Sequence, residues 1–160
     1  IAKGYTLDRI ALVLDRLGVA DYLIELGGEL VAKGRNTISE KQWLVGIDHP
    51  KNEDRNNPIV KVQLKDRALA SSGNYRKFRM APTGEKYVHT INPKTGFALE
   101  SNLLAATVIA ELDCADVDAY ATSFMAMGLE KTVKFLEDKP HLKVVLIYVN
   151  EAGDLAEFRN

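Results

Sequence analysis

Short strand-like segments joined by turn residues constrain the fold of this 160-residue chain more than any other feature. Residues 22–26 and 29–33 are both rich in strand-forming side chains, and the Gly27-Gly28 pair between them predicts a tight turn. Segments this close in sequence favour antiparallel pairing, because parallel strands need a long crossover connection. The chain therefore predicts hairpins in place of the regular alternation of strands and helices in a parallel sheet.

Further strands are expected along the rest of the chain. Turn-forming residues at 72–74 and 81–84 separate some of them, and the polar stretch 49–58 is expected to be a loop. The segment 104–112 carries β-branched Thr107, Val108 and Ile109, which predicts a central strand that is buried on both faces. The other expected strands are residues 42–47, 59–64, 68–71, 75–80, 86–91, 143–149 and 155–158.

Amphipathic or capped segments predict helices that flank these strands. Residues 7–17 place apolar side chains at three- and four-residue steps, and Gly18 follows where a helix C-cap is expected. Asp113 is the expected N-cap of a helix over 115–127 that ends at Gly128. Residues 130–138 are expected to form another helix, which ends before Pro140. The pattern predicts a single α+β domain, with a mostly antiparallel sheet and flanking helices.

Composition excludes several classes of protein. Lys and Arg number 21 against 22 Asp and Glu, so the net charge of −1 gives no positive field for nucleic acid. The single Cys114 excludes an internal disulfide and a cysteine-based zinc cluster, and we interpret it as a small buried residue. The longest apolar run, 103–110, is shorter than the roughly 20 residues of a spanning helix. Because the chain opens at Ile1 without Met or a signal core, we expect a longer protein.

Asp118 and Thr122 are the first candidate site residues. They lie four residues apart on an expected helix, so a carboxylate and a hydroxyl share one face about one turn apart. Such oxygen ligands suit Mg²⁺ that bridges to substrate phosphates. The alternative is a solvated Asp and a Thr bonded to its own helix. Asp113 and Asp116 also lie at this helix start, where capping explains them without a ligand.

His89 and two glycine-containing segments are the other candidates. His89 precedes the turn signature 92–96 and is a candidate base, although a single strand histidine is also commonly a packed or surface residue. Lys3-Gly4-Tyr5, ahead of the expected helix, and Gly27-Gly28 would let backbone approach a phosphate. Glycine pairs also mark ordinary turns. The dinucleotide, P-loop and nucleophile-elbow glycine motifs are absent from the sequence.

Four segments, in this order along the chain, resemble motifs of the FAD:protein FMN transferase family, also called ApbE. They are residues 1–8 (IAKGYTLD), 26–29 (LGGE), 72–76 (SGNYR) and 89–96 (HTINPKTG). A fifth, residues 115–122 (ADVDAYAT), stands where the family has its acidic metal-binding helix. The resemblance covers nearly the whole chain and implies an ApbE-like, T-fold-like α+β domain. Family members are about twice as long, so residues 1–160 would be the C-terminal part of one.

The resemblance implies Mg²⁺-dependent transfer of FMN from FAD to a Thr or Ser hydroxyl of a target protein, with release of AMP. By motif match, Asp118 and Thr122 would hold the Mg²⁺ on the FAD pyrophosphate. His89 would accept the proton of the incoming hydroxyl. The expected contacts with FAD are Lys3, Gly27, Gly28, Ser72 and Gly73.

Two departures from the family pattern bear on the metal site. Asn92 stands where an Asp is common before Pro93, and a backbone carbonyl ligand of the family would lie ahead of Ile1, outside this chain. The family pattern therefore implies that this piece alone would lack one ligand of the metal site. The family's N-terminal residues over the flavin ring are also outside it.

The resemblance also bears on partners and location. It implies a redox or respiratory target protein, a periplasmic or membrane-anchored lipoprotein, and membrane attachment only through a lipid anchor outside this chain. Three alternatives stay open: hydrolysis of FAD to FMN and AMP, a non-catalytic flavin-binding module, and a structural domain without a ligand.

Overall fold

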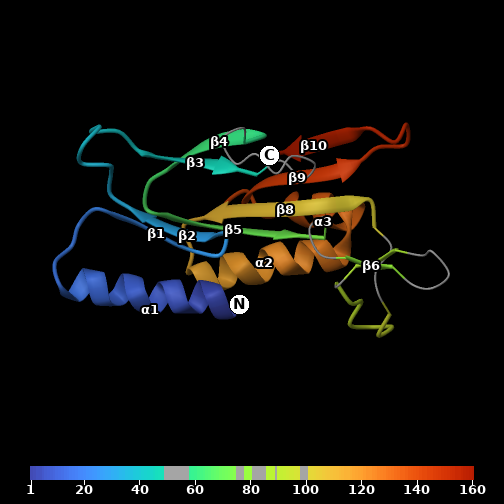
Figure 1. Ribbon diagram of the computed structural model, residues 1–160, viewed down its shortest axis with the longest axis horizontal. Helices are drawn as coiled ribbons and strands as arrows, with labels where there is room; N and C mark the ends of the chain where they lie inside the picture. Colours follow the sequence, from blue (N-terminus) through green and yellow to red (C-terminus); the bar gives the residue numbers. More distant parts are fainter. Residues whose placement is uncertain (49–57, 75–77, 81–85, 89, 98–100) are drawn as a thin grey trace.

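A six-stranded antiparallel sheet forms the middle layer of the fold (Figure 1). The computed structural model describes residues 1–48, 58–74, 78–80, 86–88, 90–97 and 101–160. The helices are α1 (Ala2–Arg16), α2 (Cys114–Met127) and α3 (Leu129–Leu136). The strands are β1 (Tyr22–Leu26), β2 (Glu29–Lys33), β3 (Trp43–Ile47), β4 (Val60–Leu64), β5 (Arg67–Gly73), β6 (Phe78–Met80), β7 (Lys86–Val88), β8 (Leu103–Ala110), β9 (Lys143–Val149) and β10 (Leu155–Arg159).

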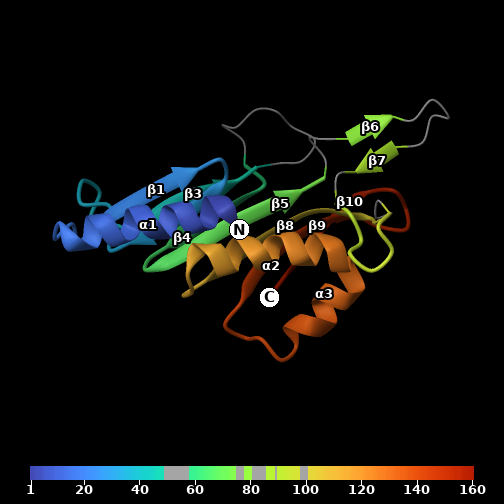
Figure 2. The same cartoon turned by 90° about the horizontal axis from the view of Figure 1, so that it is seen from below.

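The layers confirm the predicted α+β class. The main sheet has the strand order β1-β2-β5-β8-β9-β10, and every neighbouring pair of these described strands is antiparallel. The three helices lie on one face of the sheet, and the β3–β4 hairpin covers part of the other (Figure 1). A separate pair, β6–β7, lies at one end of the molecule (Figure 2).

The first hairpin, β1–β2, turns at the predicted glycine pair. Gly27 and Gly28 have φ angles of 60° and 103°, which glycine adopts without the steric cost that other residues meet. Leu26 therefore pairs with Glu29 directly across the turn. The bounds predicted for β1 and β2 are confirmed, and so are those of β9.

Strand β8 is central and buried on both faces, as predicted. Ala106 and Val108 pack among the helices, whereas Ala105 and Ile109 pack under the β3–β4 hairpin. The strand lies between β5 and β9 in the sheet. Because both faces of β8 are covered, its sequence is apolar instead of alternating, except at Thr107, whose buried hydroxyl lies 2.8 Å from that of Ser71.

The first helix begins earlier than its apolar spacing predicts. α1 starts at Ala2, so Lys3-Gly4-Tyr5 lies within the helix and not ahead of it. Gly4 packs against the start of α2, where an added Cβ would overlap the backbone of Cys114 and Ala115. The first turn of α1 is therefore fixed by its contact with another helix and not by an apolar stripe of its own.

Of the other predicted helix boundaries, some are confirmed and some are not. Gly128, with φ of 79°, ends α2 as predicted. It is also the N-cap of α3, which runs from Leu129 to Leu136 and not over the predicted 130–138. Asp113 occupies the N-cap position of α2, but its side chain makes no cap hydrogen bond there. Among the described residues, no helix is long and apolar enough to cross a membrane. Residues 49–57 of the predicted loop 49–58 lie outside the described residues.

Candidate functional site

Two carboxylates, those of Asp118 and Asp8, join the N-terminal turns of α1 and α2. Asp118 Oδ2 accepts a hydrogen bond from Gly4 N–H at 3.1 Å. In the other direction, the carboxylate of Asp8 accepts from Cys114 N–H at 2.7 Å and from Ala115 N–H at 2.9 Å. These amides lie in first turns, which have no partner within their own helix and which favour negative charge. The exchange brings Asp118 to the start of α1.

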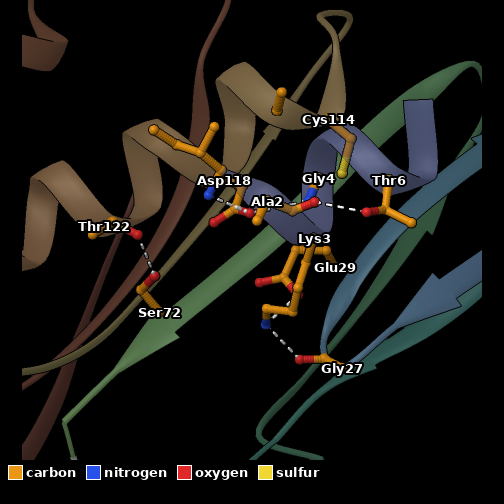
Figure 3. A network of polar contacts seen from close by, with 12 residues as sticks. Ala2, Lys3, Gly4, Thr6, Gly27, Glu29, Ser72, Cys114, Asp118 and Thr122 are labelled. Carbon is orange, nitrogen blue, oxygen red and sulfur yellow. Dashed lines mark hydrogen bonds and ion pairs between the residues drawn. The ribbon is translucent and has the colours of Figure 1, made fainter. Parts of the chain in front are cut away.

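A second contact joins α2 to β5. The hydroxyls of Thr122 and Ser72 lie 3.1 Å apart, which is hydrogen-bond distance. Asp118 lies one turn before Thr122 on the same side of the helix (Figure 3). Asp118 is 5% exposed, whereas Thr122 is exposed. Thr122, a predicted metal ligand, and Ser72, a predicted FAD contact, are thus brought together from separate segments at the surface.

Lys3 and the hairpin turn form the other side of the site. The ammonium of Lys3 donates a hydrogen bond to Gly27 O at 2.9 Å and makes an ion pair with Glu29. The side chain of Lys3 is 48% exposed, whereas that of Glu29 is only 2% exposed. Gly27 and Gly28 are exposed beside them. A cation at this position faces both solvent and a buried carboxylate.

Glu29 was not identified as a site residue from the sequence. Burial raises the pKa of its carboxyl group; the nearby ammonium of Lys3 opposes that rise, and the charge of Asp118 adds to it. Strand alternation was the available signal, because Glu29 lies on the same face of β2 as Val31, which packs among the helices. Asp8 was also missed, since its partners lie on a helix far along the chain.

The oxygen set fits part of a magnesium site. Asp118, Thr122 and Ser72 offer a carboxylate and two hydroxyls, which are the hard ligands that Mg²⁺ prefers. No cluster of three or more His, Cys, Asp or Glu suited to a metal occurs in the described part of the chain. Such a site fits an ion that shares its coordination with substrate phosphates.

His89 lies outside the described residues, and its predicted role is untested by the structure. The next residue, Thr90, donates a hydrogen bond to Asn74 Oδ1 at 2.7 Å. Asn74 is buried and directly follows Gly73 at the end of β5. The segment that begins at Thr90 is thus attached near Ser72 and Gly73, which are both predicted FAD contacts.

Cys114 is buried, as expected. Burial raises the pKa of its thiol to about 12, and the charges of Asp8, Glu29 and Asp118 act in the same direction. Its Sγ lies 3.7 Å from Leu30 O. A thiol with so high a pKa is not a nucleophile at neutral pH.

Comparison with known proteins gives a consistent result. The model of the ApbE family matches residues 1–146 of the chain. A FAD:protein FMN transferase from Haemophilus influenzae is 33% identical over 153 residues, which are 96% of this chain and 43% of the relative. One from Vibrio cholerae is 31% identical over 153 residues, covering 96% of this chain and 44% of the relative.

Solved structures agree in fold. The apo form of the flavinyl transferase ApbE from Pseudomonas stutzeri matches with a TM-score of 0.81 and 30% identity, over 99% of this chain and 47% of that chain. The apbe protein from Thermotoga maritima matches with a TM-score of 0.79 and 28% identity, over 98% and 48%. The chain therefore spans less than half the length of these relatives.

Proposed function

Because this chain belongs to the ApbE family, we propose that it supplies the metal- and phosphate-binding part of a FAD:protein FMN transferase. The observation that carries the proposal is the meeting of Asp118, Thr122, Ser72 and Lys3 around the junction of α1, α2 and β5. An acidic metal site beside a lysine ammonium suits the pyrophosphate of a dinucleotide. Since the chain spans less than half of its relatives, the complete activity belongs to a longer protein.

Asp118 and Thr122 are the proposed holders of Mg²⁺. When bound, Mg²⁺ would neutralise negative charge on the phosphates of FAD. The hydrogen bond from Gly4 N–H to Asp118 Oδ2 fixes the orientation of that carboxylate. Ser72 fixes the Thr122 hydroxyl in the same way from β5. Both ligands are thus held before any substrate arrives, which lowers the cost of ordering them.

In the proposed reaction, the hydroxyl oxygen of a Thr or Ser on the target protein forms a bond to the phosphorus of the FMN half of FAD. The bond from this phosphorus to the oxygen bridging the two phosphates breaks, and AMP leaves with that oxygen. His89 accepts the proton of the attacking hydroxyl. The proposed FAD contacts are Lys3, Gly27, Gly28, Ser72 and Gly73.

The proposal includes the partner and its location. A redox or respiratory subunit is the proposed target, on the periplasmic side of a membrane. Attachment to that membrane would be through a lipid anchor outside this chain. The resemblance to the family supports these points.

The test measures AMP release and flavin attachment by the full-length protein that contains this chain. We expect Asp118→Asn to lower the Mg²⁺-dependent rate at least about tenfold, because the amide oxygen of Asn lacks the negative charge with which a carboxylate binds the metal. Asp116→Asn is the matched control, since Asp116 lies on the same helix and is exposed. Full activity in a folded Asp118→Asn variant would contradict the metal assignment.

The products separate the alternative activities. AMP together with flavin bound covalently to the target protein indicates transfer, whereas AMP with free FMN indicates hydrolysis of FAD. FAD binding without AMP release indicates a non-catalytic flavin-binding module. A rise in Tm that requires both FAD and Mg²⁺ would support the binding site independently of turnover.

A further inference from the structure

Glu29 carries a carboxylate that is buried in an ion pair. Its side chain is only 2% exposed, and its Oε2 atom contacts the ammonium of Lys3. Burying a carboxylate costs stability through lost hydration, and pairing it with a cation does not in general recover that cost. The arrangement therefore requires an explanation other than a gain in fold stability.

The surroundings of Lys3 supply that explanation. Its ammonium, which has three N–H donors, contacts Glu29 on the buried side and donates to Gly27 O in the hairpin turn. The side chain is still 48% exposed, and the hydrogen bond from its ammonium to Gly27 O lies at the surface. Two contacts from different parts of β1–β2 therefore fix the end of an otherwise flexible side chain (Figure 3).

The same place lies close to the proposed metal ligand. The charge of Asp118 raises the pKa of Glu29, and the N–H of Gly4, the residue after Lys3, donates to Asp118. The fixed ammonium thus stands beside the carboxylate around which the phosphates would bind. Glu29 itself is too deeply buried to meet a substrate directly.

We propose that Glu29 is a positioning residue that holds the ammonium of Lys3 at the rim of the site, ready to bind a phosphate group of the dinucleotide. This inference rests on the proposed function of the site. An ordered lysine loses less side-chain freedom when it binds an anion, so the affinity gains from the order that Glu29 imposes. The burial of Glu29 therefore lowers the stability of the fold while it orders Lys3.

A double-mutant cycle tests this coupling. The dissociation constant of FAD in saturating Mg²⁺ is measured for the full-length protein, for Glu29→Gln, for Lys3→Met and for the double variant. We expect each single variant to bind FAD about tenfold more weakly, the change that follows from losing one charge-assisted contact. The double variant should bind no more weakly than Lys3→Met, because Glu29 acts through Lys3.

Two further readouts distinguish positioning from a structural role. Glu29→Gln should keep or raise Tm, because it removes a buried charge while preserving shape, and it should raise KM for FAD more than it lowers kcat. Glu111→Gln is the control, since it breaks an exposed ion pair with Arg67. Its FAD affinity should be unchanged.

Each other outcome overturns the inference. Additive losses in the cycle, an unchanged FAD affinity in Glu29→Gln, or a marked fall in its Tm would show that Glu29 does not act through Lys3. Failure of the unaltered protein to bind FAD would overturn the proposed function itself, and the positioning role with it. The two failures are therefore distinguishable by the behaviour of the unaltered protein.

Discussion

Asp118 Oδ2 accepts a hydrogen bond from Gly4 N–H at 3.1 Å, so the proposed metal ligand also anchors the first turn of α1. The helix junction and the candidate site thus share one carboxylate. Because Asn keeps an oxygen acceptor for this amide, Asp118→Asn separates the two roles better than Asp118→Ala. Asp8, which accepts the counterpart bonds from the start of α2, is not a proposed metal ligand. Substituting Asp8 therefore tests the helix junction separately from the metal site.

The first prediction concerns Asp8 as the cap of α2. Asp8→Ala should lower the free energy of unfolding by about 1–2 kcal/mol, because two first-turn amides lose their acceptor. Urea unfolding followed by circular dichroism measures this change. Asp113→Ala is the control, since Asp113 sits at the N-cap position without a cap hydrogen bond, and it should change stability by less than about 0.5 kcal/mol. Equal effects of the two substitutions would refute the assignment.

The second prediction concerns the close approach at Gly4. In an exposed helix, replacing Gly by Ala stabilises by about 1 kcal/mol. Gly4→Ala should instead destabilise by about 1–3 kcal/mol, because its Cβ would overlap the backbone of Cys114 and Ala115. Urea unfolding measures the change in the free energy of unfolding, and its sign distinguishes the two expectations. Ser123→Ala, at an exposed position of α2, controls for helix propensity.

Local signals in the sequence were sufficient where structure depends on neighbours. The Gly27-Gly28 turn fixes both of its strands, because the φ angles of the turn are decided by these two residues alone. Asp118 and Thr122 share one helix, so their spacing predicted that they lie on one face. Their roles as metal ligands stay predictions.

Signals were absent where structure depends on distant partners. The start of α1 was not predicted because its partner is distant in sequence. Asp118, which accepts a hydrogen bond from Gly4 N–H, lies 114 residues away from Gly4. Asp8 was missed for the same reason. Glu29 belongs to the motif at residues 26–29, but only the packing of β2 under α1 shows that its carboxylate is buried beside Lys3.

The third prediction concerns the thiol of Cys114. Its pKa of about 12 and its burial predict no reaction with a thiol-specific reagent at mildly alkaline pH while the chain is folded. In denaturant, the same thiol should react at the rate of an ordinary cysteine. The measurement compares the two rates on this chain, in which Cys114 is the sole cysteine. A fast reaction in the folded state would contradict the buried position.

The last prediction concerns Tyr22, which donates a hydrogen bond to Asp15 Oδ1 at 3.0 Å and so joins β1 to α1. Burial, and then the bond to Asp15, raise the pKa of Tyr22 to about 12 from an ordinary value of 10.0. The folded state therefore holds the phenol proton more tightly than the unfolded state, and stability is lost as the pH rises from about 10 towards 12.

Tyr22→Phe removes this proton and should flatten the alkaline fall in the free energy of unfolding. Urea unfolding at several pH values in this interval measures the slope for both proteins. The variant should also be less stable than the unaltered chain below pH 10, because it lacks the hydrogen bond to Asp15. Tyr148→Phe, on the distant strand β9, serves as the control. Identical alkaline slopes for Tyr22→Phe and the unaltered chain would show that the phenol of Tyr22 titrates alike in the folded and unfolded states.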